Sequence, residues 1–508
     1  MNLLSSTTVF SFYTMLSRVL GYFRDILIAI FLGTSIYADA FFVAFRLPNT
    51  FRRLFAEGTF NAAFIPSYTA EKIKSKTQGK KFADEVLTLL TLGLLTIVLI
   101  VEILTPYVVY LIAPGFIEDK TKFNLAVDLT RVTFPFLAFV SLSSFFAGIL
   151  NSENKFAAAA AAPIFLNLIL IFSLVFSYYF KLDYALSLSY GVSLSGLIQL
   201  IFLIYFASKY YQPSLVFRNK IRQKVKFFLK KLLPSIFSSG VTQISILIGT
   251  IIASFQSGAV SYLYYADRIY QINLAIAGIA VSTVSLPILS KLIKNKKDNQ
   301  VNKIQNKSLE LSLLLSLPAS VALIIGSEVI VNALFGYGSF TESDIEQTSL
   351  ALKYFGYGIP AFAVLKIFAN FFFARDNTIT PFKVSSVVVF TNIVISILFF
   401  KKIGFIIIPI ATTVSTWIGI FYYLYLLLKL SYFKINSQFY TNLIKIVFAT
   451  SIMSYIFLKG LNYFAKNLTY SSDYKVLYLL VIVIFVALLY FLICYFLKVL
   501  NLKSFKTN

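Results

Sequence analysis

Apolar stretches of about twenty residues or more alternate with short polar segments along the whole chain, and a helix needs about 20 apolar residues to cross a bilayer. Two of them, 157–180 and 403–428, contain no Asp, Glu, Lys or Arg. The pattern predicts an all-α polytopic membrane protein with about 14 transmembrane helices. The predicted spans are 6–31, 36–64, 85–112, 126–150, 157–180, 184–208, 230–255, 261–289, 308–334, 347–373, 383–400, 404–429, 440–458 and 475–498.

The positive charges gather between alternate spans. The chain is 58% hydrophobic with a net charge of +24, and Lys and Arg concentrate in 71–81, 209–231 and 291–307, whereas 256–260 and 336–346 have almost none. Because basic loops stay on the cytoplasmic side, we expect a multi-pass membrane protein with both termini in the cytoplasm. The charge therefore indicates membrane lipids and not nucleic acid as its partner.

The residues that usually bind metals are almost absent. The chain has no His and one cysteine, Cys494, which argues against His/Cys metal sites and disulfides. We expect no metal, no cofactor and no catalytic residues.

The two halves of the chain are weakly similar. A glycine, an arginine and a proline recur in the same order at an offset of about 220 residues, which is typical of repeated transporter halves; they are Gly33, Arg46, Pro66 and Gly258, Arg268, Pro287. The repeat predicts two six-helix lobes around a central cavity, 1–210 and 211–432, followed by a helix pair, 433–508.

Charged residues lie inside the first predicted span. Residues three, four or seven apart share a helix face, so Ser17, Gly21 and Arg24 line one face, and Arg18 and Asp25 lie beside it. Arg24 is about 14 Å from the turn that follows, at 1.5 Å per residue.

The second predicted span carries a longer charged stripe. Asp39, Arg46 and Arg53 are spaced by sevens, Glu57 continues their stripe, and Arg52 lies beside it. Pro48 removes a helical hydrogen bond, so a bend is expected there.

Placing an arginine side chain near the centre of the bilayer costs at least about 2.5–3.5 kcal/mol of free energy, unless the side chain is paired or faces water. Ion pairs that only hold helices together are one interpretation: Arg18 with Asp25, Asp39 with Arg46, and Arg53 with Glu57. The five arginines outnumber the three carboxylates in 17–57. A surplus of guanidinium groups favours a bulky anion such as a phosphate.

The second half of the chain also places an arginine and other polar residues inside a predicted span, as the first two spans do. Tyr264, Arg268 and Gln271 share one helix face inside a predicted span, with Asp267 adjacent. An Asp267–Arg268 pair near a helix end is the alternative.

These segments resemble the MurJ/MviN lipid II flippases of the MOP exporter superfamily. The resemblance is carried by SRVLGYFRD (17–25), DAFFVAFRLPNTFRRLFAEGTFNAAFIP (39–66), APGF (113–116), ILN (149–151), YYADRIYQ (264–271), LP (286–287) and FFARDNTITP (372–381). It implies fourteen helices and transport of the undecaprenyl-pyrophosphate-linked disaccharide pentapeptide, lipid II, from the inner to the outer leaflet by alternating access. It also implies functional roles for Ser17, Arg18, Arg24, Asp39, Arg52, Arg53, Glu57 and Arg268.

The resulting hypothesis is a transporter, not an enzyme. Arg24, Arg52 and Arg268, assisted by Arg18, Arg46, Arg53 and Gln271, are expected to bind the pyrophosphate. Ser17, Gly21, Asp25, Asp39, Pro48, Glu57 and Asp267 are expected to orient those groups or to gate the site. Lipid II and other cell-wall synthesis proteins are the expected partners.

Two alternatives stay open. Another MOP-type transporter, either a polysaccharide-lipid flippase or a multidrug/cation antiporter, would share the fold, although a drug antiporter would more naturally place acidic residues in its cavity. A membrane enzyme acting on polyprenyl phosphates would need clustered carboxylates or a histidine.

Overall fold

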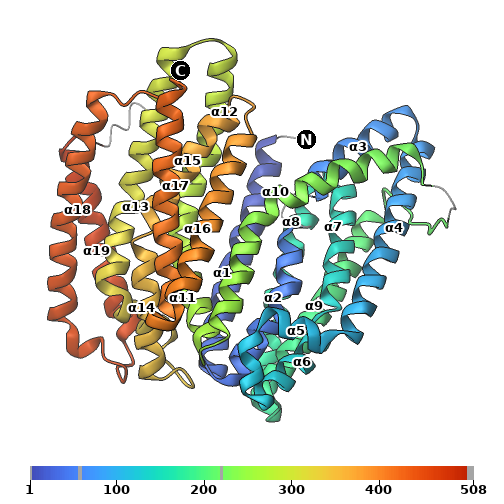
Figure 1. Ribbon diagram of the computed structural model, residues 1–508, viewed down its shortest axis with the longest axis horizontal. Helices are drawn as coiled ribbons and strands as arrows, with labels where there is room; N and C mark the ends of the chain where they lie inside the picture. The colour runs from blue at the N-terminus through green and yellow to red at the C-terminus, as the bar shows by residue number, and fades with distance from the viewer. Residues whose placement is uncertain (1–2, 55–59, 218–220, 500–508) are drawn as a thin grey trace. The chain divides into compact units, whose positions relative to one another are not determined.

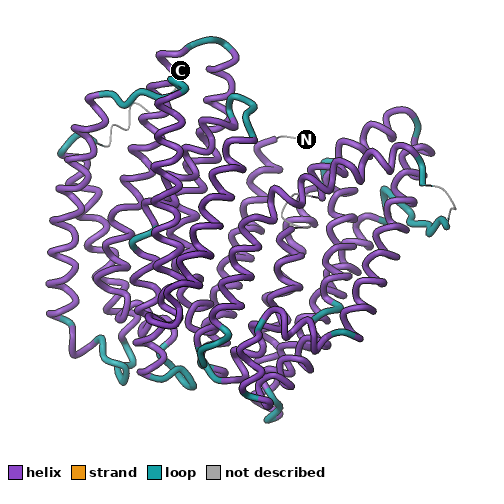
Figure 2. Tube along the Cα trace, viewed as in Figure 1, coloured by secondary structure: helices purple, strands orange, loops and turns teal. Residues whose placement is uncertain are grey.

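The computed structural model describes residues 3–54, 60–217 and 221–499. Helices make up nearly all of these residues, and no strand occurs among them (Figure 2). The chain divides into two compact units, Met1–Ser261 and Tyr262–Asn508. The expected division into lobes of six helices with a terminal pair stays a prediction.

The first unit contains the helices up to the start of α11 (Figure 1). They are α1 (Leu3–Leu32), α2 (Ile36–Leu54), α3 (Phe60–Lys74), α4 (Lys76–Ile103), α5 (Thr105–Ile112), the 3₁₀ turn η2 (Pro114–Glu118), α6 (Lys120–Thr133), α7 (Phe136–Ser152), α8 (Phe156–Phe180), α9 (Tyr184–Ala207) and α10 (Gln223–Ala253).

The second unit continues from within α11 to the C-terminal hairpin. Its elements are α11 (Ala259–Leu274), the π-helix η3 (Ala275–Ala280), α12 (Val281–Lys294), α13 (Asp298–Phe335), α14 (Glu342–Gly356), α15 (Ile359–Phe373), α16 (Ile379–Ile403), η4 (Gly404–Ile406), α17 (Ile407–Lys429), α18 (Ser437–Tyr463), η5 (Ala465–Asn467) and α19 (Lys475–Phe496).

Over the described residues, each predicted span coincides with a helix or with consecutive helices, and residues 55–59 of the span 36–64 lie outside them. Among the described residues, nine helices are long and apolar enough to cross a membrane, or ten when the bent pair α14 and α15 counts as one span. One of the nine, Ile379–Lys429, contains both α16 and α17, and the chain turns between them at Gly404, whose φ is 74°. The protein is an all-α, multi-pass membrane protein.

Several helices begin where a polar side chain can satisfy their first amide groups. Asp119 accepts hydrogen bonds from the amides of Thr121 and Lys122 at the start of α6, and Asp183 accepts one from Leu186 at the start of α9. Such caps satisfy amides that lack a partner within the helix, and an acidic cap also stabilises the positive end of the helix dipole.

The core of the first unit is rich in aromatic side chains. Phe60 and Phe64 of α3 stack at 5.2 Å between ring centroids, and Phe64 also contacts Phe82 of α4, Phe145 of α7 and Phe228 of α10. All five rings are buried. The N-terminal part of α10 therefore packs into the core of the first unit with α3, α4 and α7.

The backbone carries the same repeat as the sequence. Gly33 and Gly258 both adopt left-handed φ angles, of 58° and 75°, at the turns before α2 and α11. A second pair of left-handed φ angles occurs before α8 and α16, at Asn154 (58°) and Asp376 (56°). A third pair occurs before α9 and α17, at Lys181 (52°) and Gly404 (74°). Non-glycine residues rarely adopt this conformation, so three such pairs at nearly constant spacing support a duplicated helical unit.

In the second unit, α13 packs against both α14 and α18, the first helix of the C-terminal hairpin. Lys475, at the start of α19, is buried, and its ammonium group donates hydrogen bonds to Asn332 Oδ1 (3.0 Å) and to the carbonyl oxygens of Gly336 (2.6 Å) and Tyr470 (2.8 Å). Because a buried ammonium needs such acceptors, this contact fixes α19 to the end of α13.

Candidate functional site

Arg24 lies at the centre of a buried polar cluster between α1 and α8. Its side chain donates to Asp25 Oδ1 from Nε (3.0 Å) and from Nη2 (2.6 Å), and Nη1 donates to Asn167 Oδ1 (2.8 Å). The exposed fractions of Arg24 and Asp25 are 6% and 2%. The guanidinium plane is therefore held by a carboxylate on one side and an amide on the other, which fixes its direction.

Asn167 joins this cluster to the face predicted for α1. Its side-chain amide donates to the carbonyl oxygen of Ser17 (2.8 Å) and to Ser17 Oγ (3.3 Å). A Cβ atom at Gly21 would lie 3.4 Å from Asn167 Oδ1. Ser17, Gly21 and Arg24 thus share one face, as their spacing predicts, and a glycine in the middle lets α8 approach closely.

The alternative pair of Arg18 with Asp25 is wrong. Arg18 is exposed, and the described ion-pair partner of Asp25 is Arg24. The pair was predicted because residues seven apart share a helix face, whereas adjacent residues point about 100° apart. The side chain of Arg24 is long enough to bend across that angle and pair with Asp25, the next residue.

Asp39 lies in the first turn of α2 and is completely buried, with an exposed fraction of 0%. Its carboxylate accepts hydrogen bonds from Lys122 Nζ (2.6 Å), from the amides of Gly258 and Ser261 (2.9 Å each) and from Ser261 Oγ (2.6 Å). Lys122 also lies over the ring of Phe116, with Nζ 4.2 Å from the centroid. Asp39 therefore binds the first turn of α11 and a buried ammonium.

This arrangement corrects two expectations for Asp39. The described contacts of its carboxylate are with Lys122, Gly258 and Ser261, so it does not orient a guanidinium group of its own helix, and the alternative pair with Arg46 is not formed. Arg46 is half-buried. Asp39 lies at the start of α2 beside the N-terminus of α11, where amide groups and the helix dipole favour a carboxylate.

The C-terminal part of α2 holds the other arginines of the predicted stripe. Pro48 lies inside α2, and Arg52 Nε donates to Asn49 Oδ1 at 3.0 Å. Arg52 and Arg53 are half-buried. Glu57, and with it the alternative pair of Arg53 and Glu57, lies outside the described residues.

In the second unit, Arg268 of α11 binds Tyr264 one turn earlier. Arg268 Nη2 donates to the Tyr264 hydroxyl at 2.9 Å, and the guanidinium lies over the tyrosine ring, 4.6 Å from its centroid. Gln271 donates to Asp267. The spacing thus correctly predicts that Tyr264 and Arg268 share a face. Directly after α11 the chain continues as the π-helix η3.

Two residues of these clusters escaped the sequence analysis. Asn167 is an isolated amide in an otherwise apolar span, and a polar residue inside a span is a usable signal. Lys122 lies in a short polar segment beside Lys120. Nothing in the sequence distinguishes the buried ammonium of Lys122 from an ordinary loop charge.

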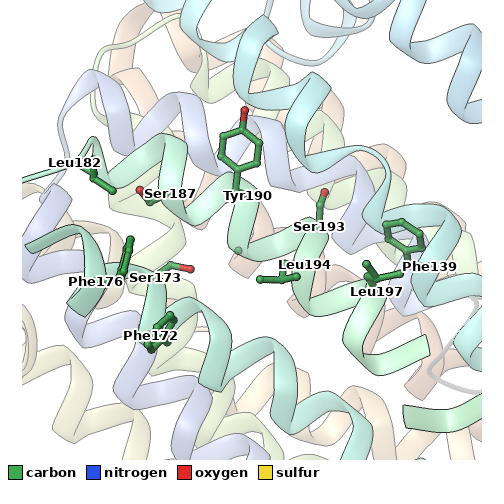
Figure 3. A pocket seen from close by; sticks show the side chains of 11 residues that line it. Phe139, Phe172, Ser173, Phe176, Leu182, Ser187, Tyr190, Ser193, Leu194 and Leu197 are labelled. Carbon is green, nitrogen blue, oxygen red and sulfur yellow. The ribbon is translucent and has the colours of Figure 1, made fainter. Parts of the chain in front are cut away.

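An apolar hollow of about 530 Å³ lies elsewhere in the first unit, between α7, α8 and α9. Figure 3 shows Phe172 and Phe176 of α8 and Tyr190 and Leu194 of α9 lining it. No charged side chain lines it. Since it lies on membrane-spanning helices, it suits hydrocarbon chains and not a phosphate.

The fold is that of a multi-pass helical membrane protein with a buried arginine, Arg24, between two of its helices, and its class follows from comparison with known proteins. A solved structure of lipid II flippase MurJ in an inward-closed conformation matches 97% of this chain and 99% of its own, with a TM-score of 0.82 and 27% identity. An inward-facing multidrug transporter of the MATE family in the MOP superfamily matches with a TM-score of 0.69 at 13% identity, over 84% of this chain and 98% of its own, which supports the fold.

The sequence relationships are more specific. The family model described as lipid II flippase MurJ matches residues 28–479. A probable lipid II flippase MurJ of Rhizobium meliloti is 38% identical over 447 residues, which are 87% of this chain and 83% of the relative. The lipid II flippase MurJ of Burkholderia cenocepacia is 32% identical, over 80% of each chain. The chain belongs to the MurJ family of lipid II flippases.

Proposed function

We propose that this protein moves lipid II from the inner to the outer leaflet of the bacterial cytoplasmic membrane by alternating access, with both termini in the cytoplasm. The observation that carries the proposal is the family match over residues 28–479. Arg24 adds chemical support, because it is a buried, oriented guanidinium group of the kind that binds phosphate oxygens bidentately.

The substrate's pyrophosphate is the part that cannot enter hydrocarbon unaided. In the first unit the proposed pyrophosphate ligands are Arg24 and Arg52, with Arg18, Arg46 and Arg53 nearby in sequence. In the second unit they are Arg268 and Gln271. Asp25 holds Arg24 when substrate is absent, so that the buried guanidinium stays paired through the cycle.

Depletion of the protein in living cells tests the activity. Lipid II is expected to accumulate and to become inaccessible to a membrane-impermeant reagent added from outside, because its pyrophosphate cannot cross the hydrocarbon layer unaided. Re-expression of the wild-type chain should restore accessibility. If the reagent still reaches lipid II from outside after depletion, the proposal is rejected. As a specificity control, the flipping of other polyprenyl-linked sugars should be unchanged by the depletion.

Replacing Asn167 with alanine is expected to slow lipid II translocation in vesicles about tenfold. The change removes one hydrogen bond to the charged Arg24 and the contact with Ser17, and such bonds to charged groups contribute about 1.5–3 kcal/mol. Asn392→Ala is the matched control, because Asn392 is likewise an amide in an apolar helix, but its side chain donates to Thr412 and accepts from no arginine among the described residues. Equal effects of the two changes would contradict the role of Asn167.

A further inference from the structure

A basic pocket lies at the end of the first unit where α3 meets α4 and α10 begins. It has a volume of about 520 Å³ and is lined by Glu71, Lys74, Gln78, Lys81, Phe82, Arg222 and Lys224. Four of these side chains are cationic and one is anionic. They come from three separate helical segments and the residue before α10, so the tertiary structure creates this concentration of charge.

Two buried carboxylates of α4, Asp84 and Glu85, hold the chain beside the pocket. Glu85 of α4 accepts a hydrogen bond from the Arg222 amide (2.7 Å) and lies 3.5 Å from Arg222 Nε. Asp84 accepts hydrogen bonds from the Tyr211 hydroxyl (2.6 Å) and the Ser214 amide (3.1 Å). Burial, together with the bond to Asp84, raises the pKa of Tyr211, so its hydroxyl remains a donor. The segment before α10 is thereby fastened along α4, and Arg222 is held at the pocket.

Two lysines of the pocket keep an unbalanced charge. Lys74 pairs with Glu71 at 2.6 Å, and Arg222 pairs with Glu85. Lys81 and Lys224 form no ion pair within residues 3–54, 60–217 and 221–499. The pocket thus carries a net positive charge that the described part of the chain does not neutralise.

The N-termini of α4 and α10 border the same pocket. Neither helix has an acidic residue in its first turn, whereas α6 and α9 begin with aspartate caps. Cations at the positive end of a helix dipole are unfavourable by about 0.3–1 kcal/mol each, and an anion there is favourable. An anion in the pocket would neutralise the net positive charge of the lining residues, and it would also interact favourably with the positive ends of the α4 and α10 helix dipoles.

The surroundings distinguish a lipid from a soluble anion. Ile73, Ile221 and Phe227 are large apolar side chains that are exposed next to the pocket residues, with exposed fractions of 80%, 36% and 56%. Beyond Glu85 and beyond Lys231, the sequences of α4 and α10 become apolar and enter predicted spans. Apolar residues beside lysines at this depth are typical of the lipid headgroup region.

We propose that this pocket binds the phosphate of an anionic phospholipid headgroup, through Lys81, Lys224, Lys74 and Arg222. The acyl chains lie beside the exposed apolar side chains, and the headgroup fixes the segment before α10 at the membrane surface. The proposal uses the orientation proposed above only to name the leaflet, which is the cytoplasmic one.

Native mass spectrometry of the full-length protein in neutral detergent, titrated with phosphatidylglycerol or phosphatidylcholine, tests this site. Wild-type protein is expected to retain phosphatidylglycerol in preference to phosphatidylcholine. The double variant Lys81→Gln/Lys224→Gln is expected to bind phosphatidylglycerol about 30-fold more weakly, since each cation near a lipid phosphate contributes about fivefold. Both lysines are exposed, so the variant is expected to fold normally.

Lys80→Gln/Lys226→Gln is the matched control, because it removes the same charge from exposed positions on α4 and α10 that do not line the pocket. Equal weakening by the two double variants would indicate general attraction to the surface and overturn the proposal. Displacement of the lipid by equimolar inorganic phosphate would indicate a soluble ligand and overturn it as well. Normal lipid II translocation without phosphatidylglycerol binding would reject this site alone and leave the proposed transport activity intact.

Discussion

Charge reversal at Arg24 is expected to abolish lipid II translocation in reconstituted vesicles while the protein remains in the membrane. The guanidinium of Arg24 is oriented by Asp25 and Asn167 in a buried position. Arg24→Glu places a second carboxylate beside Asp25, so the cluster repels the pyrophosphate it is proposed to bind. Removing one member of a buried ion pair also costs about 3–5 kcal/mol of folding stability, so translocation is compared per mole of folded protein and is expected to fall to background.

Loss of folding could imitate this result, so a second variant separates the two effects. Arg24→Gln/Asp25→Asn removes both charges and leaves no buried carboxylate without a partner. Its thermal stability is expected to remain close to that of the wild type, and its translocation is expected to stay at background. Arg24→Lys keeps the charge but loses the planar fork, and an intermediate rate is expected.

Arg131→Glu is the control for charge reversal at an arginine outside the cluster. Arg131 is about half exposed on α6, and the ion pair described for it, with Asp128, is long at 3.9 Å. Exposed substitutions of this kind usually change stability by less than about 0.5 kcal/mol, so translocation should be close to that of the wild type. Wild-type translocation by a folded Arg24→Gln/Asp25→Asn variant would refute the assigned role of Arg24.

The second large effect is expected at Asp39, and it concerns stability. All four groups that contact its carboxylate are donors: Lys122 Nζ, the amides of Gly258 and Ser261, and Ser261 Oγ. Asp39→Asn turns one acceptor oxygen into a donor that faces another donor, and it leaves the buried ammonium of Lys122 without a counter-charge. The expected loss is about 3–5 kcal/mol of unfolding free energy.

Thermal unfolding of the purified protein, followed by intrinsic fluorescence, measures this effect. Asp39→Asn should lower the Tm strongly, whereas Ser261→Ala, which removes one neutral donor, should cost only about 1 kcal/mol. The double variant Asp39→Asn/Lys122→Met should be more stable than the single variant, because the unpaired ammonium is gone. A strictly additive double variant would show that the two charges do not interact.

The fold was largely predictable from the sequence because the membrane imposes a simple rule on it. Backbone polar groups in hydrocarbon must be satisfied within each segment, so an apolar stretch of sufficient length can only be a helix. Wherever the structure describes them, the predicted segments therefore coincide with helices. The same regularity made the face of Ser17, Gly21 and Arg24, and the contact of Arg268 with Tyr264, predictable from residue spacing alone.

Partners that come from other helices were not predictable in this way. Asp39 binds Lys122 and the first turn of α11, and Arg24 binds Asn167 of α8, although each of these partners is more than 80 residues away in the chain. Helical periodicity specifies which residues share a face, but it contains no information on which helix packs against that face. The sequence by itself thus determined the membrane class, the helices and the arginine-rich segments, and only tertiary packing decided which of those charges are buried and what neutralises them.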